Sequence, residues 1–417
     1  MKQFWKLFIF VVVLMAAFSS CKDDGEVFNM LPETKPIRLT EAQKQMRDNN
    51  NEFAWRLFQT VYEEQGDSST VLSPISVTYL LGMLNAGAAG TTRDEITAVL
   101  GFGNDAEALN EFCKKMIEGA PDVDPAATVK IANCIDVNSA MGLSLLKQYV
   151  NDMKKFYNAQ IDALDFTKSS TLDKINSWCK KNTDGMIPSI LDEINPNAAM
   201  YLLNAIYFNA DWAEKFDVND TRNSSFTRVD GSVVTQPLMH RKAIALCCES
   251  DLCSMMCIPF GSGGYQMYVM LPAEGKTVND LIREMTQQSL TDHLNAGNMT
   301  AHEIDILMPK FEIVSDIDLL EILKSMGITT AFTPVADFSN MSSADLYVSK
   351  IRQRAKIEVN EDGAKASAVT IAEMSFTAAG PQEYQKSEFH ANRPFLYLIR
   401  EESTRSIFFI GTYCGES

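Results

Sequence analysis

The stretch that most constrains the fold lies near the C-terminus, at residues 361–371, directly after a strand-like segment at 351–360. Read with the period of two of an extended chain, this stretch has one side that carries only small side chains. They belong to Ala364, Ala366, Ala368 and Thr370. Such a side makes a poor permanent core, because alanine buries little apolar area. It suits a segment that is held outside a β-sheet and later slides between packed strands, and Gly363 provides a backbone pivot at its entrance.

This stretch resembles the hinge of the serpins, a family of protease inhibitors with a mobile reactive loop. The family usually shows an acidic pair, Gly, Thr, Glu, and then a run of alanines that ends in Thr. Residues 361–370 read Glu-Asp-Gly-Ala-Lys-Ala-Ser-Ala-Val-Thr. The departures at Lys365, Ser367 and Val369 fall on the side that would stay outside the core, and Ala364 is small. We therefore expect an inhibitory hinge, with an ordinary surface loop between two strands as the alternative.

The resemblance to the serpins continues from about residue 51 to residue 411, in order and in one register. The strongest matches outside the hinge are the Ser-Pro-Ile-Ser run at 73–76 and the run at 82–96. The resemblance implies an α+β protein with the serpin fold, in which helices pack around a large mixed main β-sheet and two smaller sheets. It also implies an exposed reactive loop at about 361–390. The length of 417 residues is enough for one large domain, and we expect a single serpin domain at 41–417.

Charge and composition exclude several classes of function. Apolar residues make up 46% of the chain and charged residues 22%, as in a globular domain rather than a disordered segment. The net charge is −17, and no basic run occurs in the sequence. Nucleic acid is therefore not an expected partner, because binding to phosphates needs clustered Lys and Arg. We expect a monomer whose main partner is a target protease.

The N-terminus has the pattern of an export signal. Two lysines precede an uncharged apolar run at 7–17, and the small residues that follow end at Cys21. The arrangement resembles a bacterial lipoprotein signal, in which a signal peptide at 1–20 is removed and Cys21 is acylated. The acidic residues after Cys21 resemble a surface-export signal, so we expect an outer-membrane lipoprotein on the cell surface with a flexible tether at 21–40. The alternatives are a plain signal peptide, which would give a secreted protein, and a short membrane anchor, although the apolar run is shorter than the ~20 residues of a spanning helix.

The resemblance also implies which residues control the opening of the main sheet. The hinge would consist of Glu361, Asp362, Gly363, Ala364, Ala366, Ala368 and Thr370. The sheet-opening cluster would consist of Ser73, Ser76, Asn204, Gln353, Trp212 and Lys310. Among these, the resemblance places Trp212 at the top of the sheet, where insertion begins, and pairs Lys310 with Glu361. Gln353 stands where many serpins have a histidine; since Gln donates and accepts hydrogen bonds, we expect the polar cluster to survive without a pH response.

Counting along the loop gives the expected reactive bond. The family places the hinge glutamate seventeenth before the cut, which here gives the bond between Thr377 and Ala378. The loop is longer than usual, so the neighbouring bonds that begin at Phe376 and Ala378 stay open. A β-branched or small residue at the cut suits elastase-like proteases, and a preceding Phe suits papain-like cysteine proteases or subtilisins. No Arg or Lys occurs at 371–384, so trypsin-like targets are not expected unless Lys386 is used.

The sequence carries no pattern that indicates an enzyme. The chain has four histidines, no serine lies in a Gly-x-Ser-x-Gly motif, and the His-Glu pair at 302–303 lacks the second histidine of a zinc protease helix. We therefore expect an inhibitor without a cofactor, consumed once when a protease cuts its loop and the hinge inserts as a new strand. The alternative is a surface lipoprotein of serpin fold that binds or carries a ligand without inhibiting.

Four of the nine cysteines gather in an expected hairpin, at Cys247, Cys248, Cys253 and Cys257. A zinc site needs ligands that converge, whereas strand alternation scatters these four over both faces of the hairpin. We therefore expect no metal site here and interpret the four as buried thiols. A disulfide between Cys248 and Cys253 stays open as an alternative.

Three helices can be predicted from local patterns. We expect a first helix at about 41–64 from its apolar stripe. A second helix should begin after Ser73 as N-cap, with Pro74 in the first helical position. A third should begin with a capping box at 92–95, where Thr is followed three residues later by Glu.

Overall fold

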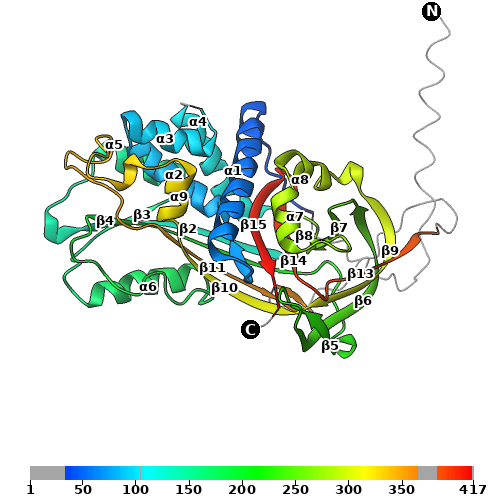
Figure 1. Cartoon of the computed structure of the whole chain (residues 1–417). Coiled ribbons are helices and arrows are strands. Elements are labelled where there is room, and N and C mark those ends of the chain that lie inside the picture. Colours follow the sequence, from blue (N-terminus) through cyan, green and yellow to red (C-terminus); the bar gives the residue numbers. More distant parts are fainter. Residues whose placement is uncertain (1–32, 104, 365–382, 416–417) are drawn as a thin grey trace, which may run out of the picture.

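The computed structural model describes residues 33–103, 105–364 and 383–415 (Figure 1). The expected signal peptide, Cys21 and the expected reactive bond at Thr377 and Ala378, with its neighbour Phe376, lie outside the described residues. Within them, no helix is long and apolar enough to cross a membrane.

Helices form the first group of elements in the described residues. They are α1 (Glu41–Gln65), α2 (Pro74–Gly87), α3 (Gly90–Leu100), α4 (Ala106–Gly119), α5 (Lys147–Tyr157), α6 (Ser170–Asn182), α7 (Val278–Glu284), α8 (Gln287–His293) and α9 (Leu320–Met326). The expected first helix is confirmed, and it begins at a capping box in which Thr40 and Gln43 exchange hydrogen bonds. The expected start of α2 is also confirmed, with Ser73 as N-cap and Pro74 at the first helical position.

The predicted capping box at 92–95 was wrong, because both side chains serve another segment. Helix α3 begins at Gly90 with Ala89 as N-cap, three residues before the predicted start. The hydroxyl of Thr92 accepts a hydrogen bond from the backbone N–H of Asp337 at 2.9 Å. The Glu95 carboxylate accepts backbone N–H bonds from Thr329 at 2.8 Å and Thr330 at 2.7 Å. The pattern that resembles a local cap is therefore a tertiary link to the chain after α9.

Strands form the second group. They are β1 (Thr70–Leu72), β2 (Ala127–Asn138), β3 (Gln160–Leu164), β4 (Met200–Asp211), β5 (Arg222–Thr227), β6 (Val233–Glu249), β7 (Cys253–Phe260), β8 (Tyr265–Pro272), β9 (Thr300–Pro309), β10 (Phe311–Asp318), β11 (Arg352–Val359), β12 (Gly363–Ala364), β13 (Gln385–His390), β14 (Phe395–Glu401) and β15 (Ser406–Tyr413). Residues 385–390, expected to belong to the loop, are thus a strand, and β13 pairs in parallel with β9.

The strands form three sheets. The largest has nine strands in the order β1-β15-β14-β8-β7-β6-β9-β13, with β5 paired to β6. A four-stranded sheet has the order β12-β4-β2-β3, and β10 pairs with β11 in a two-stranded sheet. The parallel pairs β2–β3 and β9–β13 make two of the sheets mixed. The expected α+β architecture, with helices around mixed sheets, is confirmed.

The helices lie on both faces of the four-stranded sheet. Helix α6 covers one face, and α1 to α5 with α9 gather on the other (Figure 1). Under α6, an apolar cluster joins Cys134 of β2 and Leu203 of β4 to Ile175 and Cys179 of the helix. The larger core lies on the opposite face and continues into the nine-stranded sheet. Alternate residues of β2 therefore face two separate cores.

The cysteine hairpin forms as expected from β6 and β7, but its disulfide does not. Cys248 pairs in the strand register with Met255 rather than with Cys253. All eight cysteines of the described residues are free thiols. Cys247, Cys253 and Cys257 are buried, and burial raises the pKa of the Cys253 thiol to about 12. These three behave as the buried thiols that the sequence predicts, whereas Cys248 is only partly buried.

The last part of the expected tether at 21–40 packs on the domain. The backbone N–H of Ile37 donates to the Ser403 hydroxyl at 2.8 Å, and that of Lys35 donates to the Val123 carbonyl at 2.8 Å. Ile37 is buried, and its side chain lies where a Cβ on Gly119 would clash. The expectation of a flexible tether was therefore wrong for residues 35–37, because an apolar side chain there finds a place on the core.

Candidate functional site: the hinge and the slot beside β4

Two strand edges face each other between β4 and β11. Along one edge, β4 pairs with β2 from Met200 to Ala210, and β11 pairs with β10 over its whole length. Along its other edge, β4 pairs with β12 at Ala210 and Asp211 only. Within the described ranges, no strand pairs with the rest of that edge or with the second edge of β11. We call the space between these two edges, along Met200–Asp211 and Arg352–Val359, the slot.

The hinge already occupies the top of the slot. Gly363 and Ala364 form β12, antiparallel to the end of β4. Gly363 has a φ of +131°, and a Cβ on it would lie 2.4 Å from the Ala210 carbonyl oxygen and 2.5 Å from the Trp212 backbone nitrogen. Glycine is needed here for two reasons, the backbone conformation and the close approach of β4. The need for a free backbone conformation can be foreseen from the sequence, whereas the close approach of β4 cannot.

Glu361 anchors the hinge just before it enters the slot. Its carboxylate accepts hydrogen bonds from the Thr221 hydroxyl at 2.8 Å and the Lys310 ammonium at 3.2 Å. Its own carbonyl accepts the backbone N–H of Phe216 at 3.0 Å. Burial alone would raise the pKa of Glu361, but its backbone N–H, Thr221 and Lys310 together hold the pKa below its usual value. The ion pair with Lys310 that the resemblance implies is therefore present, and Thr221 is an additional partner.

Trp212 closes the top of the slot. Its indole N–H donates to the Asn360 carbonyl at 2.9 Å, and its backbone N–H donates to the Asp362 carbonyl at 2.9 Å. The ring stacks on Phe260 with centroids 4.4 Å apart. The Asp362 carboxylate pairs with the Lys215 ammonium at 3.0 Å. Residues 360–362 are therefore fixed to the end of β4 by both backbone and side-chain contacts.

In the polar cluster below the slot, the side-chain amide of Gln353 exchanges two hydrogen bonds with the backbone of Ser73. The Gln353 side chain accepts the Ser73 N–H at 2.9 Å and donates to the Ser73 carbonyl at 2.7 Å. The Ser73 and Ser76 hydroxyls form a hydrogen bond at 3.0 Å, so Ser73 does not cap α2 with its side chain. Asn204 lies elsewhere on β4 and donates to the Asn133 side chain on β2 at 2.9 Å. The expected members are therefore spread over three places, because Trp212 and Lys310 contact the hinge instead.

The segment after α6 crosses over the slot. We call residues 183–199 the strap. On the β2 side, Lys130 pairs with Asp184 at 2.6 Å. On the β11 side, Arg354 donates to the Ser189 hydroxyl at 2.6 Å and pairs with Asp192 at 2.6 Å. Because β4 lies between these attachment points, the strap spans β4 and the slot.

The far end of the slot contains a small cavity of about 50 Å³. It lies between α2, the beginning of β4 and the segment 346–351 that leads into β11. Leu80, Leu84, Met200 and Leu202 contribute apolar lining. The slot therefore has a hinge at one end, a strap across its outer face and an apolar cavity at the other end.

The structure describes some of the expected site residues and not others. Ala366, Ala368, Thr370, Phe376, Thr377 and Ala378 lie outside the described residues, and so does the side chain of Ala364. Sequence reasoning missed Lys215, Thr221 and the strap partners of Arg354. The arginines of β11 alternate on one face with period two, which was a usable signal for a charged face. Their partner Asp192 is 162 residues away from Arg354, and no local pattern points to it.

Comparison with known proteins decides the family. The model of the family described as "Serpin (serine protease inhibitor)" matches residues 48–415 of the chain. The chain belongs to the serpin family. The serpin is similar to human serpin I2, with 29% identity over 382 residues that cover 89% of this chain and 92% of the relative. Serpins are protease inhibitors rather than catalytic enzymes.

Solved serpin structures share the fold. The native state of the thermophilic serpin tengpin has a TM-score of 0.80 and 29% identity, covering 93% of this chain and 97% of tengpin. Human thyroxine-binding globulin, solved with thyroxine, has a TM-score of 0.81 and 27% identity, covering 90% of this chain and all of that one. Because β4 and β11 are neighbours across the slot, we call the four-stranded and two-stranded sheets of this serpin together its main sheet.

Proposed function

We propose that this serpin is an irreversible inhibitor of proteases that traps the acyl-enzyme when the cut reactive loop inserts into the slot. Membership of the serpin family supports protease inhibition as the class of activity. The slot is the observation that carries the mechanism. Its two facing edges lack a strand partner within the described part of the chain, and Gly363 and Ala364 already pair with β4 at its top.

The proposed chemistry is supplied by the protease. Its serine or cysteine nucleophile attacks the carbonyl carbon of Thr377, and the peptide bond to Ala378 breaks. The new amine takes a proton and leaves, so the protease stays bound as an ester or thioester of Thr377. Insertion of about fifteen residues at ~3.3 Å each then moves the protease by roughly 50 Å. The outcome depends on whether insertion is faster than hydrolysis of the acyl bond.

The slot has room for most of the inserting segment. Strand β4 has 12 residues, which corresponds to about 40 Å at ~3.3 Å per residue, so it can pair with about twelve of the fifteen inserting residues. Each inserted residue would satisfy backbone groups on the open edges, and each hydrogen bond contributes a net ~0.5–1.5 kcal/mol. The side with Ala364, Ala366, Ala368 and Thr370 is small enough to enter a packed sheet. The uncut loop holds the native state in a kinetic trap until cleavage.

A gel experiment with a panel of proteases tests the proposal. Wild-type protein should give a band that survives denaturation, with the mass of the serpin minus its C-terminal peptide plus the protease. Loop cleavage by a non-target protease should also raise the temperature of unfolding, because the hinge can then insert. If cleavage neither produces a covalent band with any class of protease nor changes the unfolding temperature, the insertion mechanism is wrong.

The loop sequence favours a particular class of target. Cleavage between Thr377 and Ala378 would present a β-branched residue to a shallow pocket, as elastase-like serine proteases require. Phe376 in the preceding position suits papain-like cysteine proteases or subtilisins. The mass of the released C-terminal peptide identifies the bond that is cut. A peptide that begins at Ser387 would instead show that a trypsin-like protease uses Lys386.

A second candidate is a non-inhibitory binding or carrier protein. The likeness to thyroxine-binding globulin, a serpin solved with a small ligand, favours keeping this candidate. The hinge argues against it, because the inserting side retains only small residues. Loop cleavage without a covalent band, by every protease of the panel, would support the carrier.

We also propose that the protein is a lipoprotein of the cell envelope, anchored through an acylated Cys21 and exposed at the surface. The apolar run at 7–17, the small residues before Cys21 and the acidic residues after it support this proposal. Incorporation of a labelled fatty acid into wild-type protein but not into Cys21→Ala is the expected result. Digestion of the serpin by protease added to intact cells would establish that it is exposed at the surface. Absence of fatty-acid label from both the wild type and Cys21→Ala would favour plain secretion.

A further inference from the structure

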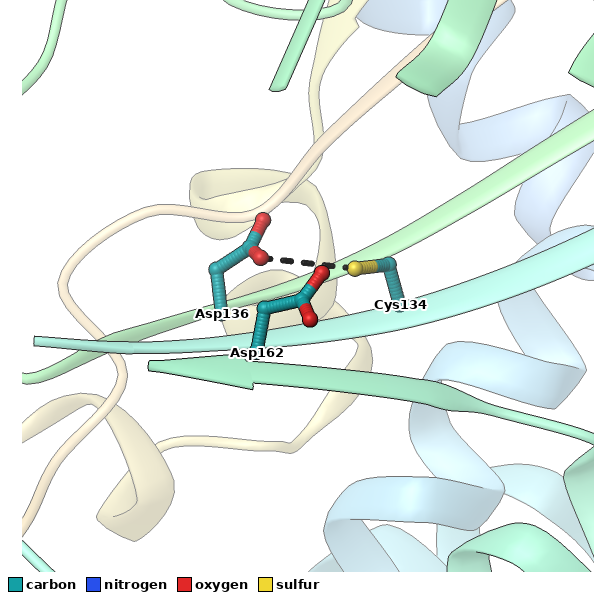
Figure 2. A group of neighbouring side chains, drawn as sticks. All are labelled: Cys134, Asp136 and Asp162. Atoms are coloured by element: carbon teal, nitrogen blue, oxygen red, sulfur yellow. Dashed lines mark hydrogen bonds between the residues drawn. The ribbon is translucent and has the colours of Figure 1, made fainter. Parts of the chain in front are cut away.

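A thiol and two carboxyl groups converge on the face of the main sheet that α6 covers. Cys134 and Asp136 lie two residues apart on β2, so their side chains project from the same face. Asp162 lies on β3, directly beside Asp136 in the parallel register. Figure 2 shows the three side chains pointing toward one another, and one possible ligand atom from each lies within 4.8 Å of the others.

The cluster is unusual because no cationic side chain of the described residues pairs with its negative charge. Asp136 is only 2% exposed, and its one hydrogen bond comes from within the cluster, from the Cys134 thiol at 3.5 Å. Asp162 accepts a bond from the Gln160 side-chain amide at 2.5 Å. Over the described ranges, no lysine, arginine or histidine forms an ion pair with either carboxylate. Burial and the neighbouring Asp162 raise the pKa of Asp136 to about 7, although the Cys134 thiol acts in the opposite direction.

Ordinary packing does not account for this arrangement. A buried carboxylate normally has a cation or several hydrogen-bond donors, because removing its charge from water costs several kcal/mol. The surrounding cluster under α6 is apolar and includes Phe166, Ile175 and Cys179. Two acids side by side in such a place also repel each other. A bound divalent cation would remove both costs at once.

The donor set and its geometry fit a zinc-type ion. A thiolate with two carboxylates is a mixed soft and hard set, which suits borderline ions such as Zn²⁺ and its spectroscopic substitute Co²⁺ better than Mg²⁺ or Ca²⁺. Tetrahedral bonds of about 2.0–2.3 Å place ligand atoms roughly 3.3–3.8 Å apart. The distance of 3.5 Å between the Cys134 sulfur and an Asp136 oxygen is already in that range, and the remaining ligand distances need to shorten by no more than about 1.5 Å.

We propose that Cys134, Asp136 and Asp162 form a site for a zinc-type divalent metal ion between β2 and β3, with water in the fourth position. Binding releases the thiol proton to solvent, and the ion joins two neighbouring strands under α6. Since the site lies on the half of the main sheet that borders the slot through β4, metal binding stabilises that half. An ion that binds the folded chain and not the unfolded chain raises the unfolding temperature as its concentration rises.

Titration of the full chain with Zn²⁺ after removal of metal by a chelator tests the site. We expect binding of one ion by calorimetry, and a rise of the unfolding temperature with Zn²⁺. With Co²⁺ we expect a sulfur-to-cobalt charge-transfer band. Cys134→Ser should abolish that band, and Asp136→Asn and Asp162→Asn should each weaken binding at least ~10-fold.

Cys179→Ser is the matched control, because Cys179 is a buried thiol of the same apolar cluster that lies outside the proposed ligand set. It should keep the band and the affinity. If Asp136→Asn fails to fold, the metal affinity of Asp162→Asn tests the site instead. Asp162 lies on the edge strand β3 and is less buried, so its substitution disturbs the fold less. Absence of binding by the wild type, or a band that persists in Cys134→Ser, would overturn the proposal. A more stable Asp136→Asn protein together with no metal binding by the wild type would identify a proton-sharing pair of acids instead.

Discussion

The hinge glycine gives the sharpest test of how the native state is held. In Gly363→Ala, the new Cβ would lie within 2.4–2.6 Å of the backbone of Ala210, Asp211 and Trp212. These atoms belong to β4 and its end and cannot rotate away as a flexible side chain can. The hinge must therefore leave the top of the slot, and the pairing of β12 with β4 must break.

The cost can be worked out from the contacts that are lost. A residue other than glycine at a φ of +131° costs roughly 1–3 kcal/mol. The bonds from the Trp212 N–H to Asp362 and between Asn360 and Gly363 contribute a net ~1 kcal/mol each. The substitution avoids the clash by losing some or all of these bonds, which gives a destabilisation on the order of 2–5 kcal/mol. For a domain of this size, the unfolding entropy is roughly 0.8 kcal/mol per kelvin, so we expect the midpoint of thermal unfolding to fall by roughly 3–6 °C.

Gly142→Ala is the control for this experiment. Gly142 has a φ of +66°, and nothing lies within 4 Å of a Cβ built on it. Its substitution should cost only the conformational part, about 1 kcal/mol. Circular dichroism melting of both variants gives the comparison, and the protease panel should show more cleaved, unbound serpin for Gly363→Ala because insertion starts from a detached hinge. Equal midpoints for the two variants would refute the close contact between Gly363 and β4.

Three further predictions follow from the hinge and the strap. Ala366→Glu places a charge on the inserting side, so the loop should be cleaved and the covalent band lost, and a wild-type yield of complex would show that the register is wrong. Asp192→Asn, which loosens the strap from Arg354, should speed insertion after cleavage, measured by stopped-flow fluorescence. The midpoint of unfolding should change little, because the Asp192 carboxylate is exposed to solvent; unchanged insertion rates would contradict a role of the strap in controlling insertion. The pKa of Glu361 is lowered in the folded state, so its ion pair with Lys310 stabilises above the unfolded pKa of about 4.3 and is lost as pH falls further. Wild type should therefore exceed Glu361→Gln in urea stability at pH 7 and match it near pH 3, and a difference independent of pH would count against this ion pair.

Local patterns were enough to predict the family and the general course of the chain. The hinge stands out because period-two small residues follow an acidic pair. The apolar stripe located α1, and the Ser-Pro signal located the start of α2. The same local reasoning misplaced the start of α3. Thr92 and Glu95 have the spacing of a capping box, but their partners are Asp337, Thr329 and Thr330. A side chain that caps its own helix cannot be told from one that serves a distant segment without the tertiary structure.

The site was predictable only where its parts are close in sequence or match the family pattern. The role of Gly363 as a pivot can be inferred from its residue type, but its contact with Ala210 depends on how β4 ends. Asn204 could be marked through the family resemblance, whereas its partner Asn133 follows from the register of β2 and β4. Cys134 and Asp136 share a face by alternation, yet Asp162 joins them only through the parallel pairing of β3.

The place of the last two strands has a consequence for how the protein is made. Strands β14 and β15 end the described chain, and they lie inside the nine-stranded sheet between β1 and β8. These two strands follow β1 and β6 to β9 in the chain, so a nascent polypeptide that stops short of them leaves β1 without β15 and β8 without β14. The nine-stranded sheet therefore cannot be completed until both strands have been synthesised.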